Sequence, residues 1–104
     1  MKEQIIQAYL VRLKRALKNG FDLVPRSINR QFLADFGLNE KTIKQCLLDL
    51  ELKDYKEGPA KDNDREGELW MFRIKLEGIE NIYIKVKIYE VDGVEYLKCI
   101  SFHN

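Results

Sequence analysis

One stretch of the sequence alternates aromatic and basic side chains. Tyr83, Lys85, Lys87 and Tyr89 occur at every second position, so on a β-strand all four lie on one face. Ammonium groups bind phosphates and tyrosine rings stack on bases, which suits such a face to a single-stranded nucleic acid. The same alternation is common on solvated antiparallel sheets, where lysines maintain solubility and discourage edge pairing. The pattern alone leaves both interpretations open.

A second candidate is His103, the only histidine and the penultimate residue. Histidine is the side chain whose ordinary pKa, about 6.5, lets it serve as acid or base near neutral pH. Residues at a chain end are often poorly ordered and without function. His103 is therefore a catalytic candidate only if the fold brings other functional groups to it.

The cysteines and the single histidine argue against a metal site. Cys46 and Cys99 lack metal-type spacing, and one chain with one histidine lacks the ligands for a structural zinc ion. Cys46 also falls within the apolar positions of an expected helix. We expect two reduced, buried thiols, no metal and no cofactor.

Length and charge limit the class of protein. The 104 residues, 45% of them hydrophobic, suffice for a single ordered domain spanning 1–104. The net charge of +1 is far from the basic total of a protein that binds nucleic acid by charge alone. Residues 1–20 carry five basic groups and one acidic group, whereas residues 51–68 carry four basic and seven acidic groups. The fold must therefore assemble any anion-binding surface locally.

Neither a membrane span nor a signal peptide is expected. No apolar run approaches the roughly 18 residues that a span requires. The first four residues include an acid and an amide, where a signal peptide would need a basic stretch leading into an apolar one. We expect a cytoplasmic protein with no membrane partner.

The N-terminal half predicts helices. Apolar residues recur at helical spacing over 3–18, and the pair Asn19–Gly20 suits the left-handed turn that ends many helices. After an extended connection over 21–26, a second helix is expected from Ser27 or Asn29 to Phe36, where Gly37 stops it. Its expected buried residues are Ile28, Phe32, Leu33 and Phe36. A third helix is expected from a cap at Asn39 to about 50–52, burying Ile43, Cys46, Leu47 and Leu50.

The C-terminal half predicts strands. Residues 53–67 have no periodicity and read as a long loop, which is a candidate for substrate contact. Alternating patterns follow over 68–76, with Trp70 on the core side, and over 82–89. A hairpin at Asp92–Gly93 leads into a strand over 94–102. The expected fold is α+β, with N-terminal helices packed on one face of a small antiparallel sheet and the opposite face left open.

Five fragments, in this order and spacing, carry a family resemblance. They are Asp54-Tyr55-Lys56, Gly58-Pro59, Glu68-Leu69-Trp70, Ile82-Tyr83-Ile84-Lys85 and Cys99-Ile100-Ser101-Phe102-His103. Together they resemble the motility quorum-sensing regulator (MqsR) toxin family of type II toxins with a RelE-like fold. The resemblance covers about half of the chain, from Leu50 onwards. It implies a ribosome-independent mRNA endoribonuclease that a cognate antitoxin holds inactive.

The resemblance also implies site residues. Three active-site positions of the family have counterparts in this chain. The family's lysine after the helical region corresponds to Lys56, its tyrosine in the middle strand to Tyr83, and its basic residue after the last Ser-Phe to His103. The last position can be lysine in the family, and a glutamine that follows the tryptophan in some members is Met71 here. Arg73, two residues further on the same strand face, could replace that glutamine.

The chemistry of RNA cleavage fits these residue types. Without a metal, the reaction needs a base for the ribose 2′-OH, cations for the phosphorane charge and an acid for the departing 5′-oxygen. His103 can be base or acid, and Tyr83 can orient the phosphate or the 2′-OH, with an acid/base role only if its pKa is lowered. The expected phosphate-binding residues are Lys85, Arg73 and Lys87, and the expected product is a 2′,3′-cyclic phosphate.

A different class of protein is also compatible with the sequence. Residues 29–50 could form a helix-turn-helix with Gly37–Asn39 as the turn, and a later hairpin could act as a wing. Lys41, Thr42, Lys44 and Gln45 would then read DNA, and the protein would be a transcription regulator without enzymatic activity. Residues 21–50 have no net charge, which argues against this interpretation.

Overall fold

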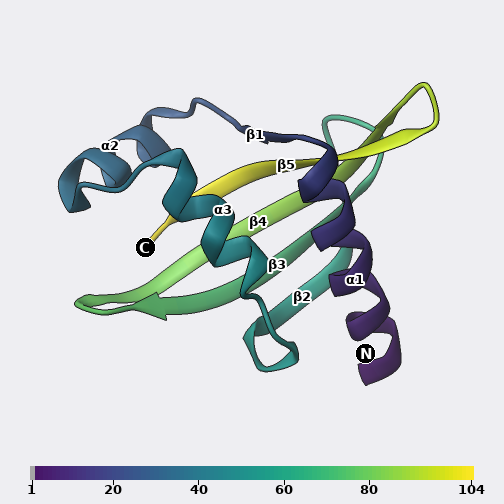
Figure 1. Cartoon of the computed structure of the whole chain (residues 1–104), viewed down its shortest axis with the longest axis horizontal. Coiled ribbons are helices and arrows are strands. Elements are labelled where there is room, and N and C mark those ends of the chain that lie inside the picture. Colours follow the sequence, from purple (N-terminus) through teal and green to yellow (C-terminus); the bar gives the residue numbers. More distant parts are fainter. Residues whose placement is uncertain (1) are drawn as a thin grey trace.

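The computed structural model describes residues 2–104, which form an α+β fold. The helices of this part of the chain are α1 (Glu3–Asn19), α2 (Ser27–Phe36), α3 (Glu40–Leu48) and the short 3-10 helix η1 (Leu52–Asp54). Its strands are β1 (Phe21–Leu23), β2 (Tyr55–Lys61), β3 (Glu68–Leu76), β4 (Ile79–Val91) and β5 (Val94–His103). All three α-helices lie on one face of the sheet, as predicted (Figure 1).

The sheet is larger than expected and is mixed rather than purely antiparallel. Its strand order is β1-β5-β4-β3-β2, and β1 pairs parallel to β5 while the other neighbours are antiparallel. The sequence interpretation missed β1 because three residues are too few to show a period. It also read β2 as part of a loop, because two register shifts near Gly58-Pro59 break the alternation of this strand.

The hydrophobic core lies between the helices and the inner face of the sheet. The side chains of Ile82, Ile84 and Val86 on β4 are fully buried, as their alternation predicted. Trp70 is buried as well, and its ring stacks on that of Tyr9 with centroids 4.0 Å apart. Both cysteines are buried free thiols, as expected.

The second helix differs from its prediction in which residues it buries. Ile28 and Phe36 were expected in the core but are 45% and 42% exposed. Asn29 is fully buried instead. Its amide nitrogen donates to the carbonyls of Val24 and Ile100, and its amide oxygen accepts from the N–H of Phe102. The short helix therefore packs through Phe32 and a bonded polar side chain rather than through a full apolar stripe.

Asn29 completes the edge of β5. The last paired residue of β1 is Leu23, opposite Cys99, so β5 continues beyond the end of its parallel neighbour. The carbonyl of Ile100 and the N–H of Phe102 would otherwise lack backbone partners on that side, and the amide of Asn29 bonds both. In this way α2 fixes the C-terminal end of β5, where His103 lies.

The end of α1 also differs from the prediction. Gly20 has φ 170° and ψ 152°, an extended conformation rather than a left-handed one. A Cβ atom at this position would lie 2.7 Å from the ring of Tyr96. The glycine is therefore required by the close approach of that ring. Asn39 caps α3 as expected, its side chain accepting from the N–H of Thr42 at 3.0 Å.

Candidate functional site

Three of the predicted site residues form a row across the outer face of the sheet, the face opposite the helices. Arg73 on β3 is paired with Tyr83 on β4, which in turn is paired with His103 on β5. The Arg73 guanidinium lies 5.0 Å from the centre of the Tyr83 ring, and the ring centres of Tyr83 and His103 are 5.8 Å apart. A cation, a phenol and an imidazole thus stand side by side on adjacent strands.

The environment of Tyr83 determines which proton chemistry is open to it. Partial burial and the nearby carboxylate of Glu57 raise the pKa of Tyr83, and the cations of Arg73 and Arg26 only partly oppose this. The phenol therefore stays protonated at neutral pH, and it can donate a hydrogen bond or a proton but cannot act as a base. The sequence interpretation allowed Tyr83 an acid/base role only with a lowered pKa, and its pKa is raised instead. Within the row, His103 is the group that can accept a proton.

The next row carries two further cations, Lys85 and Arg26. Lys85 is paired with Ser101 across β4 and β5, and the hydroxyl of Ser101 accepts a hydrogen bond of 2.9 Å from the guanidinium of Arg26. Arg26 immediately precedes α2, and the sequence interpretation did not include it. A lone basic residue before a helix gives no signal by itself, because only the packing of α2 against β5 brings it to the outer face.

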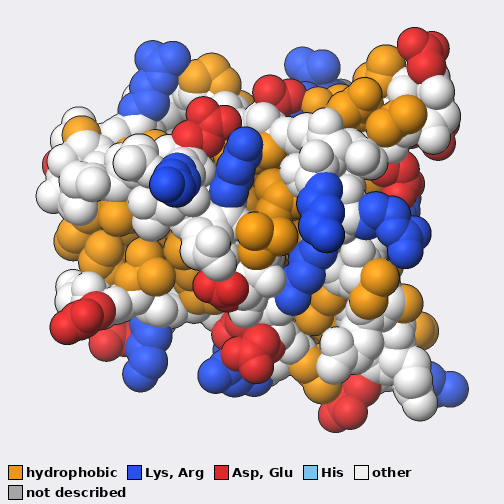
Figure 2. Space-filling view, viewed as in Figure 1, with side chains coloured by type: hydrophobic (Ala, Val, Ile, Leu, Met, Phe, Trp, Pro, Cys, Tyr) orange, Lys and Arg blue, Asp and Glu red, His pale blue; other side chains and the backbone are white. Residues whose placement is uncertain are grey.

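These cations continue into a basic groove on the outer face. The groove has a volume of about 620 Å³, and the basic and acidic residues in its lining are Arg26, Lys61, Arg65, Lys85, Lys87, Lys98, Asp62 and Asp64. The helix-covered face differs, because basic and acidic side chains are interspersed there (Figure 2). A chain with almost no net charge has thus concentrated six cations around one groove.

Lys87 is held differently from the other predicted phosphate-binding residues. Its side chain is only 9% exposed, and its ammonium forms an ion pair of 2.7 Å with Asp62. This ion pair lowers the pKa of Asp62. Asp62 begins the connection between β2 and β3, the part of the expected loop that remains irregular. The outer face is therefore partly covered rather than fully open, and Met71 on the same face is buried too.

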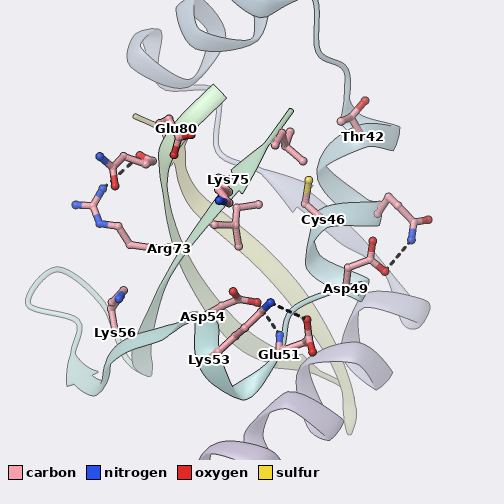
Figure 3. A pocket seen from close by; sticks show the side chains of 14 residues that line it. Thr42, Cys46, Asp49, Glu51, Lys53, Asp54, Lys56, Arg73, Lys75 and Glu80 are labelled. Carbon is pink, nitrogen blue, oxygen red and sulfur yellow. Dashed lines mark hydrogen bonds and ion pairs between the residues drawn. The ribbon is translucent and has the colours of Figure 1, made fainter. Parts of the chain in front are cut away.

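Lys56 lies at the start of β2, two strands away from Tyr83. It lines a second, larger groove of about 880 Å³ between α3 and the second half of β3. Arg73 lines the same groove (Figure 3). The structure thus brings His103, Tyr83 and Arg73 together, whereas Lys56 lies two strands from Tyr83 and shares only the lining of the larger groove with Arg73.

The helices of the alternative interpretation are also present. α2 and α3 are joined by three residues, with Gly37 in the left-handed conformation. On α3, Lys41 and Gln45 are exposed, while the ammonium of Lys44 lies 5.9 Å from the centre of the Phe21 ring. Basic residues are fewer on this helix than around the groove of the outer face.

Comparison with known proteins gives no relative from which a function could be carried over. The chain matches no protein-family model, and no curated protein or solved structure is significantly similar to it. Within residues 2–104, none of the helices has the length and apolar character needed to cross a membrane.

Proposed function

We propose that this protein is an endoribonuclease that cleaves single-stranded RNA by general acid/base catalysis. The observation that carries the proposal is the row of Arg73, Tyr83 and His103 beside the basic groove. The row offers a base, a protonated donor and a cation, and the groove offers further cations for neighbouring phosphates. These are the groups that transesterification of RNA requires.

In the proposed reaction, His103 removes the proton of a ribose 2′-OH. The 2′-oxygen then attacks the adjacent phosphorus, the bond from phosphorus to the 5′-oxygen breaks, and Tyr83 protonates the departing oxygen. Arg73 and Lys85 stabilise the additional negative charge of the phosphorane. The products are a 2′,3′-cyclic phosphate and a 5′-hydroxyl. The raised pKa of Tyr83 keeps the phenol protonated, which excludes it as the base and leaves it the donor role in this proposal.

We further propose that the enzyme is the toxin of a toxin-antitoxin pair, acting on mRNA in the cytoplasm. The support is the resemblance of the five C-terminal fragments to the MqsR family. These fragments contain Lys56, Tyr83 and His103. In this proposal Lys56 supplies positive charge beside Arg73, and a cognate antitoxin protein blocks the enzyme. Induced expression of the wild-type chain should then arrest growth, and His103→Ala should relieve the arrest.

The direct test is cleavage of a fluorescent single-stranded RNA by the purified protein with a chelator present. His103→Ala and Tyr83→Phe should each lower the rate about 10²- to 10⁴-fold, the contribution of a positioned acid or base. Arg73→Ala should also lower it, whereas Arg15→Ala, an exposed arginine on α1, should leave the rate unchanged. An RNA with a 2′-O-methyl group at the cleaved position should not be cut.

Two results would overturn the proposal. One is a wild-type protein that cuts no single-stranded RNA while binding duplex DNA tightly, which would favour the transcription regulator. The other is a His103→Ala variant that keeps its thermal stability and cuts RNA as fast as wild type. In that case the imidazole would not be the base.

A further inference from the structure

A second aromatic and cationic cluster lies on the outer face, at the opposite end of β4 from Tyr83. Tyr89 on β4 is paired with Tyr96 on β5, and their ring centres are 5.7 Å apart. The ammonium of Lys98 lies 5.1 Å from the centre of the Tyr89 ring. The cluster thus repeats the chemistry of the first row, with rings and a cation on neighbouring strands.

The rings of this cluster are held in place by the fold. The hydroxyl of Tyr89 donates a hydrogen bond of 2.8 Å to the carboxylate of Asp22 on β1. The ring of Tyr96 packs over the backbone at Gly20, a position with no room for a side chain. Both rings remain partly exposed. Rings that are already oriented lose little conformational entropy when a flat ligand stacks on them.

The basic groove lies between the two clusters. Lys85 is two residues from Tyr83, and Lys98, which contacts Tyr89, lines the same groove. Tyr83 and Tyr89 are six residues apart on one strand, so the rows lie about 20 Å from each other. A single strand of on the order of three to six nucleotides spans that distance, depending on how closely its bases stack. Arg26, Lys85 and Lys98 lie where its phosphates would pass.

We propose that Tyr89 and Tyr96 form a second subsite that stacks a base of single-stranded RNA three to six nucleotides from the cleaved phosphate. The inference rests on the proposed endoribonuclease function and deepens it, because it specifies the substrate as an extended single strand rather than a dinucleotide. The subsite binds without preference for sequence, because every base has a face on which a tyrosine ring can stack.

The consequence is a dependence of affinity on RNA length. Oligonucleotides too short to reach from Tyr83 to Tyr89 occupy only the first row, whereas longer ones also gain the stacking contact. Loss of one stacked base should weaken binding of a long RNA about 5- to 100-fold. The same loss should leave a very short RNA unaffected.

The experiment measures the dissociation constants of fluorescent oligonucleotides of about 3, 6, 9 and 12 nucleotides by anisotropy. All carry 2′-O-methyl riboses, so none is cut. The variants are Tyr89→Leu, which removes the ring, and Tyr89→Phe, which keeps the ring and loses only the bond to Asp22. Tyr96→Leu and Tyr96→Phe form a second matched pair, and each variant is first compared with wild type in thermal stability.

We expect both leucine variants to lose affinity for the longest RNA and to bind the shortest as wild type does. On long RNA without the methyl groups, which can be cut, both should show a raised KM with unchanged kcat. Both phenylalanine variants should keep most of the wild-type affinity for the longest RNA. Equal affinity of the leucine and phenylalanine variants for the longest RNA would overturn the second subsite. If unmethylated RNA of the same sequence is cut but wild-type affinity for the methylated series does not rise with length, only this inference fails. If no methylated length is bound and no unmethylated length is cut, the proposed function fails with it.

Discussion

The fully buried amide of Asn29 offers the sharpest test of how the fold positions the site. Asn29→Ala removes three hydrogen bonds, to the carbonyls of Val24 and Ile100 and from the N–H of Phe102. The three backbone groups remain near the edge of β5, where no strand replaces the lost partner. The perturbation therefore affects both stability and the position of the residues that follow.

The expected magnitude follows from the number of bonds. A typical hydrogen bond contributes about 1 kcal/mol net, so the loss of three costs about 3 kcal/mol in the free energy of unfolding. This is a large fraction of the roughly 5–15 kcal/mol by which a domain is stable. For a domain of this size it corresponds to a decrease in Tm of about 10–20 °C.

Urea denaturation followed by tryptophan fluorescence measures this effect. Trp70 is the only tryptophan, and it is buried against Tyr9, so its emission reports the loss of the core. The midpoint should shift to lower urea with the slope unchanged. Asn63→Ala, an exposed asparagine in the connection between β2 and β3, should change stability by less than about 0.5 kcal/mol.

A destabilisation below about 1 kcal/mol for Asn29→Ala would refute the reasoning, because the backbone groups would then be satisfied in some other way. The same variant, assayed well below its Tm, should cleave RNA more slowly, since the end of β5 carries His103. Normal cleavage by a strongly destabilised variant would separate stability from the geometry of the site.

Three further predictions concern the outer face. Tyr83 has a raised pKa, so its ionisation should not lower the cleavage rate of the wild type at any pH below about 10. A rate that falls as the pH rises towards 10, and that no longer does so in Tyr83→Phe, would contradict this. Asp62 has a lowered pKa because of Lys87, so the stability that it contributes is complete above its unfolded pKa of 3.8 and is lost as the pH falls through the folded value. The difference in Tm between wild type and Asp62→Asn should therefore be full at pH 7 and shrink on acidification below about pH 4, and a difference that grows there would exclude the ion pair as its cause. Gly20→Ala places a Cβ 2.7 Å from the Tyr96 ring, so it should lower the free energy of unfolding by about 1–3 kcal/mol, measured by urea denaturation. An unchanged midpoint would show that the ring moves freely.

Part of the candidate site could be predicted from local pattern. The alternation over Ile82–Tyr89 indicated both the buried face of β4 and the outward position of Tyr83 and Lys85, because a strand places every second side chain on the same side. The pairing of Tyr83 with His103 was not readable in this way. It depends on the register between β4 and β5, and β5 contains a shift between the partners of Lys85 and Val86.

Other features depended on contacts between distant residues. Arg26 bonds a hydroxyl 75 residues away, and Lys87 pairs with a carboxylate 25 residues away. Neither contact leaves a signal in the neighbouring sequence. The phosphate-binding role expected of Lys87 stays a prediction, but its ammonium is already bound to Asp62, which the alternation with Tyr83 could not reveal.

By itself, the sequence determined the three α-helices, the three long strands and the sides of β3 and β4 that turn inward. These follow from periods of 3.6 and 2 residues, which are local properties of the chain. Only the tertiary structure decided that two short segments join the sheet, that a buried asparagine completes the edge of β5, and that six cations surround one groove. The physical reason is that edge pairing, ion pairs and buried hydrogen bonds join residues far apart in the chain, and their partners are selected only when the whole core packs.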